Sequence, residues 1–243
     1  MTELNFPIEI VELPSKGLVY PEGHPLRSGK VEMKYMTAKE EDILTNQNYI
    51  SKGIVLDKLL ESLTMNKINL KELITGDKNA LLVASRILGY GKEYSFTIDG
   101  KPYDVDLSVL ENKPFNEDAI TSKGTLKFTL PASGTEIEAK FLTDKDTEVI
   151  EQEVNGLKKI NKDASPEVTT RLKHQIVSVN GSANKNDIKD FVENHLLARD
   201  SRALRNFIKD SSPDIDLKTK VVVNGVEEDI DIPINLSFFW PDF

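Results

Sequence analysis

The amino-acid sequence predicts an α+β fold made of two related modules, each a set of helices followed by a β-hairpin, that arose by internal duplication. Three observations support this prediction. Residues 30–44 resemble residues 136–150, apolar residues recur at helical spacing in both halves, and each half ends in two alternating segments joined by a turn dipeptide. We place the N-terminal module at residues 1–112 and the C-terminal module, which carries an aromatic tail, at residues 113–243.

The repeat consists of matched positions that keep their order along the chain. Within the first matched segment, Glu32, Lys34, Thr37 and Lys39 correspond to Glu138, Lys140, Thr143 and Lys145. Outside it, the Leu-Pro pair at 13–14 matches that at 130–131, LKEL at 70–73 matches IKDF at 188–191, and Asp77 matches Asp200. A collinear series of this kind favours duplication over chance similarity.

The repeated segment predicts a strand that leads into a capped helix. Apolar residues alternate with charged ones over residues 31–35, which predicts a strand with one apolar face, and the repeat predicts another at 137–141. Thr37 then starts a helix, because its hydroxyl and the Glu40 carboxylate can form a capping box with the backbone. Thr143, with an aspartate three residues later, offers the same arrangement in the second copy.

Apolar stripes predict the core helices of both modules. One stripe comprises Val55, Leu56, Leu59, Leu60 and Leu63, and another comprises Val168, Leu172, Ile176 and Val179. A further helix should run from near Asp77 to Gly89, since glycine is common just past a helix end. Its counterpart should span residues 187–207, with a break near Asp200.

The last part of each module predicts a β-hairpin. Segments of alternating polarity flank Asp99-Gly100 in the first module and Asn224-Gly225 in the second. These dipeptides adopt positive φ readily and so favour two-residue hairpin loops. Each module should therefore close with a short antiparallel pair of strands.

The composition excludes several classes of protein. The 243 residues carry 40 acidic and 31 basic side chains, giving a net charge of −9, and no cysteine. The lack of cysteine excludes disulfides, thiolate nucleophiles and zinc ribbons, and the acidic balance opposes nucleic-acid binding. Residues 1–30 lack the basic start and apolar run of a signal peptide, and no apolar stretch reaches the ~20 residues that cross a bilayer. We therefore expect a soluble protein with protein partners, not nucleic acid or membrane.

The histidines and serines do not predict a catalytic site. The three histidines are His24, His174 and His195, and their spacing matches no metal-binding motif. His195 lies at helical spacing from Ile188, so we expect it to be a partly buried helical residue. Ser133 lacks the sequence context of a nucleophile elbow.

Three D-x-D pairs leave open an alternative function, that of a metal-dependent enzyme. They are Asp104 with Asp106, Asp214 with Asp216, and Asp229 with Asp231. Two carboxylates on one strand face can hold Mg²⁺. The same alternation places charges on the solvated face of any amphipathic strand, and we favour this simpler interpretation. The prediction is therefore a non-enzymatic protein with no catalytic residue, no cofactor and no metal.

The C-terminal segment, residues 235–243, is unusually aromatic. It contains Phe238, Phe239, Trp240 and Phe243. These side chains either pack back on the second module or anchor a partner, because interface hot spots favour large aromatic residues. We take all four as candidate partner-interface residues, and expect Phe238 to face the module and Trp240 and Phe243 to face a partner.

Taken together, these segments resemble a known family. VEMKYMTAKEEDIL, the leucine-rich helix after it, LITGDKNALLVASRILGYGKEYSF and the short hairpin are similar to T4-type bacteriophage baseplate proteins, specifically to hub subunits and hub-assembly factors of contractile tails. The resemblance is clearest over residues 13–110. The closing DIPINLSFFWPD resembles the second hairpin and aromatic tail of longer members.

This resemblance implies a structural role in viral tail assembly. The protein would help to build the central baseplate hub through protein–protein contacts with other baseplate or tail hub proteins. It would act in the host cytoplasm during assembly and would be found in the virion if it stays in the baseplate. A permanent virion component and an assembly factor that leaves are both compatible with the resemblance.

Overall fold

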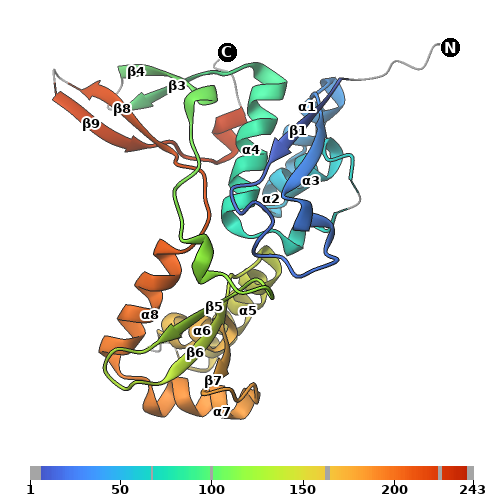
Figure 1. Ribbon diagram of the computed structural model, residues 1–243. Coiled ribbons are helices and arrows are strands. Elements are labelled where there is room, and N and C mark those ends of the chain that lie inside the picture. Colours follow the sequence, from blue (N-terminus) through green and yellow to red (C-terminus); the bar gives the residue numbers. More distant parts are fainter. Residues whose placement is uncertain (1–6, 67, 99–100, 162–164, 224–225, 240–243) are drawn as a thin grey trace.

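The computed structural model describes residues 7–66, 68–98, 101–161, 165–223 and 226–239. Figure 1 shows one helical body from each half of the chain and two β-hairpins beside the first body. Within these ranges the strands form four small sheets, and all strand pairs are antiparallel. The molecule therefore has the mixed α+β fold that the sequence predicts.

The first body combines a two-stranded sheet with four helices. The elements are β1 (Ile8–Glu12), β2 (Lys30–Lys34), α1 (Ala38–Leu44), α2 (Gln47–Ser51), α3 (Val55–Leu63) and α4 (Thr75–Tyr90). The alternation in β2 directs Val31 and Met33 into the core, where both are fully buried. The stripe predicted for α3 is confirmed, because Leu59, Leu60 and Leu63 are also fully buried.

The second body has a three-stranded sheet in the order β5-β6-β7. Its elements are β5 (Thr125–Thr129), β6 (Glu136–Lys140), α5 (Asp144–Ile160), α6 (Glu167–Gln175), β7 (Ile176–Val179), α7 (Lys185–Asp190) and α8 (Ala198–Asp210). A π-helical turn, Phe191–His195, follows α7 directly. The sheet and α8 are in contact through Phe128 and Phe207, whose rings stack at 4.5 Å.

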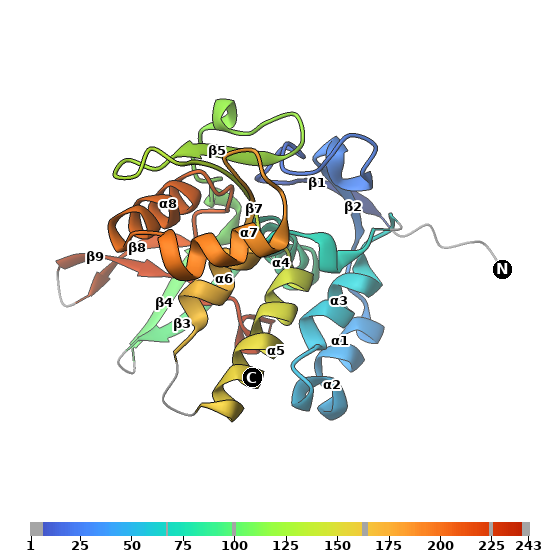
Figure 2. The ribbon, with the colours of Figure 1, turned by 90° about the horizontal axis from the view of Figure 1, so that it is seen from below.

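Both predicted hairpins are present. One consists of β3 (Glu93–Ile98) and β4 (Lys101–Asp106), and the other of β8 (Lys218–Val223) and β9 (Val226–Asp231). The predicted turn dipeptides, 99–100 and 224–225, lie outside the described residues. The two hairpins lie on the same side of the molecule (Figure 1 and Figure 2), although they come from opposite halves of the sequence.

Two connecting segments, 107–124 and 211–217, link the bodies and hairpins and are joined by backbone hydrogen bonds. The N–H of Lys113 donates to the carbonyl of Asp214 at 2.8 Å, and the N–H of Asp216 donates to the carbonyl of Glu111 at 2.7 Å. At the start of α4, a β-carbon on Gly76 would lie 2.0 Å from the carbonyl oxygen of Pro213. Glycine is therefore required where α4 meets the second connecting segment.

One large apolar core includes residues from both halves of the chain. It includes Leu59, Leu81, Ile137, Leu172, Leu204 and Phe238. A separate small cluster of Leu142, Ile150 and Val154 lies on and beside α5. Because the main cluster is continuous, the two bodies are parts of one packed structure.

The predicted helical stripe over residues 168–179 is wrong in its second part. Helix α6 ends at Gln175, and the next four residues form β7, which pairs with β6. Three of those four residues are β-branched and fit a pleated sheet better than a helix. Pairing with β6 therefore makes residues 176–179 a strand, although their apolar spacing is also typical of a continuous helix. Val168, the first residue of the predicted stripe, is 44% exposed.

Two other helix boundaries also differ from the prediction. Helix α4 continues past Gly89 to Tyr90, and Gly91, with φ of 85°, is the residue that ends it. Gly89 serves close packing instead, because a β-carbon there would lie 2.3 Å from the Met36 sulfur. The helix predicted over 187–207 is divided, as expected, but the break falls at residues 196–197, just before α8.

Candidate functional site

A buried aspartate fixes the turn after β1 to the start of α4. Asp77 is fully buried and accepts hydrogen bonds from the Ser15 backbone N–H at 3.0 Å, the Ser15 hydroxyl at 2.7 Å and the Tyr20 hydroxyl at 2.6 Å. Burial raises the pKa of Asp77, and the hydrogen bonds from Tyr20 and Ser15 oppose this rise. Burial and the nearby carboxylate also raise the pKa of Tyr20, so the phenol keeps the proton that it donates.

The matched aspartate of the second half makes a corresponding contact. Asp200 is the third residue of α8, as Asp77 is of α4. It accepts from the backbone N–H groups of Ala132 at 2.8 Å and Ser133 at 3.0 Å. Although burial opposes ionisation, these hydrogen bonds lower the pKa of Asp200. In both halves, therefore, the Leu-Pro turn is bound by the aspartate that the sequence repeat matches to it.

The predicted capping boxes are confirmed in both halves. The backbone N–H of Thr37 donates to Glu40 at 2.8 Å, and that of Thr143 donates to Asp146 at 3.1 Å. Each acid also accepts from a lysine of the preceding strand, Lys34 at 2.7 Å for Glu40. Burial raises the pKa of Glu40, but the hydrogen bonds from Lys34, Ser62 and Thr37 outweigh it and lower the pKa to about 2.

The corresponding lysine of the second half makes the same contact. The Lys140 ammonium donates to Asp146 at 2.6 Å. Burial raises the pKa of Asp146, while the hydrogen bonds from Lys140 and Thr143 lower it, and the net shift is downwards. The strand-to-helix corner therefore has the same three polar groups in both halves, a lysine, a threonine and an acid.

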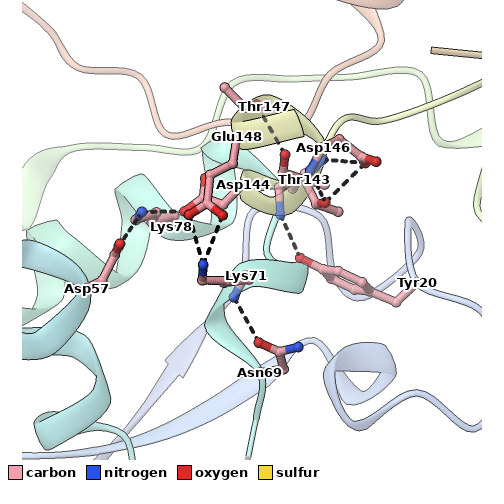
Figure 3. Close-up of polar contacts among 11 residues, drawn as sticks. Tyr20, Asp57, Asn69, Lys71, Lys78, Thr143, Asp144, Asp146, Thr147 and Glu148 are labelled. Carbon is pink, nitrogen blue, oxygen red and sulfur yellow. Dashed lines mark hydrogen bonds and ion pairs between the residues drawn. The ribbon is translucent and has the colours of Figure 1, made fainter. Parts of the chain in front are cut away.

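The start of α5 docks against the start of α4, as Figure 3 shows. The ammonium of Lys78, on α4, lies between the carboxylates of Asp57, at 2.6 Å, and Asp144, the first residue of α5. Burial lowers the pKa of Lys78, but its hydrogen bonds to the two carboxylates produce a net rise. The backbone N–H of Asp144 also donates to the carbonyl of Leu73 at 3.1 Å. A partly buried lysine and a backbone contact thus join the two bodies.

A second ion pair at this junction is exposed. The Lys71 ammonium lies 2.9 Å from Glu148 of α5, and the two side chains are 57% and 48% exposed. Exposed pairs of this kind contribute ~0.2–1 kcal/mol, because water screens both charges. The Lys78 contact with Asp144 is less exposed and is therefore the stronger polar connection between the bodies.

A groove of about 1120 Å³ opens beside this junction. Its walls are formed by the start of α4, the corner between β6 and α5, one face of α6, the end of α8, both connecting segments and the base of the second hairpin. The groove is therefore lined by residues from both halves of the chain and depends on how the two bodies are joined.

Of the four candidate interface residues of the tail, the structure describes two. Phe238 and Phe239 are fully buried within the chain. The ring centroids of Phe238 and Tyr94 lie 4.9 Å apart in an edge-to-face arrangement. The backbone carbonyl of Phe238 accepts a hydrogen bond from the Arg86 guanidinium at 3.0 Å. Trp240 and Phe243 lie outside the described residues. The start of the tail thus packs on α4 and β3 of the first half, so the expectation that Phe238 faces the second module is wrong.

The histidines are dispersed. His24 caps a short 3₁₀ turn and lies 2.8 Å from Glu72, and His174 lies 2.8 Å from Glu153. The expectation that His195 is partly buried is wrong, because its side chain is 64% exposed. The π-helical turn Phe191–His195 has a wider repeat than an α-helix, so it rotates His195 off the buried stripe.

The D-x-D pairs fit the simpler interpretation where they lie in hairpins. Asp229 and Asp231 stand opposite Lys220 and Lys218 across the second hairpin. Asp214 belongs to a connecting segment, where it accepts from Lys113. In the described ranges, no three His, Asp or Glu side chains are placed to hold a metal ion. Likewise, no helix there is long and apolar enough to span a bilayer.

Sequence reasoning found the caps and the matched aspartates but missed the junction and the groove. Lys78 follows Asp77 directly and stands in no recognisable motif, and its partners Asp57 and Asp144 are far away in the sequence. The acidic first turn of α5 was a local signal, but of its two acids only Asp146 entered the sequence prediction, as a helix cap.

A comparison with protein families gives a match to nearly the whole chain. Residues 8–240 match the model of the family described as T4 bacteriophage base plate protein. Because the match covers almost the whole chain, the protein belongs to this family. Comparisons with curated proteins and with solved structures give no significant match.

The junction yields a testable difference between its two lysines. Lys78→Met should lower the free energy of unfolding by ~1.5–3 kcal/mol, because it leaves two partly buried carboxylates without their shared partner. Lys71→Met, the matched control, should lower it by less than ~1 kcal/mol. Urea denaturation of both variants measures this difference. Equal effects would contradict the assignment of Lys78 as the main polar connection.

Proposed function

We propose that this protein is a non-enzymatic component of the baseplate hub, either a hub subunit or a hub-assembly factor. The observation that carries the proposal is the family match over residues 8–240. The similarity of residues 13–110 to hub subunits and hub-assembly factors gives the finer assignment. On this proposal the chain acts in the host cytoplasm through contacts with other baseplate proteins and enters the virion if it remains in the hub.

The structure offers several surfaces for such contacts. The groove combines residues from both bodies, and strand β1 exposes Ile8 and Ile10, which are 47% and 60% exposed, on one face of a two-stranded sheet. Grooves and exposed apolar patches of this kind mark sites of protein–protein contact. Their presence on one chain supports a role in joining other proteins.

Mass spectrometry of purified virions, isolated baseplates and hub intermediates from infected cells tests the hub assignment. We expect the chain in hub intermediates. Its presence in virions as well would identify a permanent subunit, and its absence there would identify an assembly factor. Absence from hub intermediates and virions alike would refute the proposal, as would recovery only with peripheral baseplate parts.

We further propose that the two halves are modules at 1–112 and 113–243 derived by duplication. The support is the matched pair of aspartate contacts, at Asp77 and Asp200, and the matched capping boxes at Thr37 and Thr143. When the two halves are superposed, residues 31–35 should overlie 137–141, with both threonines at equivalent positions. Placement of these segments in unrelated elements would refute the duplication.

For the tail, we propose that Trp240 and Phe243 anchor a hub partner while Phe238 and Phe239 hold the tail on the first half. The double variant Trp240→Ala/Phe243→Ala should keep its melting temperature and lose co-purification with hub proteins. Phe238→Ala, the control, should lower the free energy of unfolding by ~3–5 kcal/mol through cavity formation. A double variant that still co-purifies would remove Trp240 and Phe243 from the interface.

A further inference from the structure

The groove between the two bodies differs in charge from the rest of the chain. It is lined by five basic residues, Lys113, Arg171, Arg205, Lys209 and Lys218, and by four acidic ones, Glu167, Asp210, Asp214 and Asp231. The whole chain, by contrast, has 40 acidic residues against 31 basic ones. Basic side chains are therefore concentrated in this groove.

Most of these basic groups have no carboxylate partner among the residues that the structure describes. Lys113 pairs with Asp214 at 3.2 Å, which neutralises one charge of each sign. Arg171, Lys209 and Lys218 are exposed and form no ion pair with any described residue. Arg205 donates to the backbone carbonyl of Ser201, at 3.3 Å, and forms no ion pair within the described part of the chain. Four cationic groups thus remain available to a ligand.

Fewer of the acidic groups are available. Glu167 is paired with Lys158, at 2.5 Å, outside the groove lining. Asp210 and Asp231 remain, and neither forms an ion pair within the described ranges. The free charges of the groove therefore comprise four cations and two anions, which favours an anionic ligand.

The size and the apolar lining indicate the kind of ligand. A volume of about 1120 Å³ is close to the upper end of the ~300–1,000 Å³ typical of ligand sites and leaves room for several side chains of a polypeptide segment. Between the charges lie apolar side chains, including Val168, which is 44% exposed, and Leu172, about one turn further along the same helix. Such a lining accepts apolar side chains as well as carboxylates.

We propose that this groove binds an acidic segment of another baseplate protein. Carboxylates of that segment would meet Arg171, Arg205 and Lys209, and its apolar side chains would cover Val168. This inference rests on the proposed function, because it names the chemistry of one partner. Nucleic acid fits less well, since the walls between the cations are apolar and the chain as a whole is acidic.

The occupant can be tested with synthetic probes on the full chain. The first probe is a fluorescein-labelled peptide of about ten residues in which Glu and Leu alternate around a central Pro. The second is the same peptide with Gln in place of Glu, and the third is a thymine oligonucleotide of similar length. Fluorescence anisotropy gives affinities at low and high salt, and NMR chemical-shift mapping locates the bound probe.

We expect the acidic peptide to bind in the groove, with amide shifts centred on Arg171 and Lys209 and an affinity that falls as salt rises. The glutamine peptide should bind at least about tenfold more weakly, because it lacks the charges. Equal binding of the two peptides, shifts centred elsewhere or no binding of the acidic peptide would overturn the inference. So would tighter binding of the oligonucleotide at the same residues.

A matched pair of charge-reversal variants separates the groove from general charge. Arg171→Glu/Lys209→Glu should weaken binding of the acidic peptide at least about tenfold. Lys39→Glu/Lys189→Glu makes the same change in net charge at exposed positions outside the groove lining and should alter binding less than about twofold. Equal losses in both variants would refute a specific groove.

Circular dichroism and melting temperature establish whether each variant is folded. If the groove variant does not fold, Arg171→Gln/Lys209→Gln replaces it, with an expected loss of at least about threefold. A negative result of the peptide-binding test can be distinguished from a negative result for the hub proposal. A chain found in hub intermediates that does not bind the acidic peptide would refute only the groove inference, whereas absence from those intermediates would refute the hub role.

Discussion

The buried carboxylate of Asp77 is the contact on which the arrangement of the first body depends. It accepts three hydrogen bonds from Ser15 and Tyr20, and the Tyr20 hydroxyl in turn accepts from the backbone N–H of Ile74 at 3.3 Å. A carboxylate removed from water is costly unless its oxygens are satisfied in this way. The contact therefore fixes both the turn after β1 and the position at which α4 begins.

The start of α4 is also where the second body attaches. Leu73 accepts the backbone N–H of Asp144, Lys78 joins the carboxylates of Asp57 and Asp144, and Gly76 lies against Pro213. These contacts come from four segments that are distant in the sequence. A shift in the position of α4 would therefore move the junction and the groove beside it.

The groove exists because two bodies meet without filling the space between them. Connecting segments that pair with each other hold the bodies at a fixed distance, and α6 and α8 contribute basic side chains to the walls. A continuous apolar core keeps this arrangement intact. For a family whose members belong to the phage baseplate, a preformed charged groove gives a partner a binding site that needs little rearrangement.

Local sequence patterns were sufficient to predict several elements and the two helix caps. Strand alternation, the capping residues Thr37 and Thr143 and the stripe of α3 depend on neighbours a few residues away, and all were predictable. Tertiary structure alone decided the rest: residues 176–179 became a strand because β6 offered an edge, and His195 was exposed by a π-helical turn. The partners of Lys78 and the cations of the groove were also decided in this way, because long-range packing leaves no local pattern in the sequence.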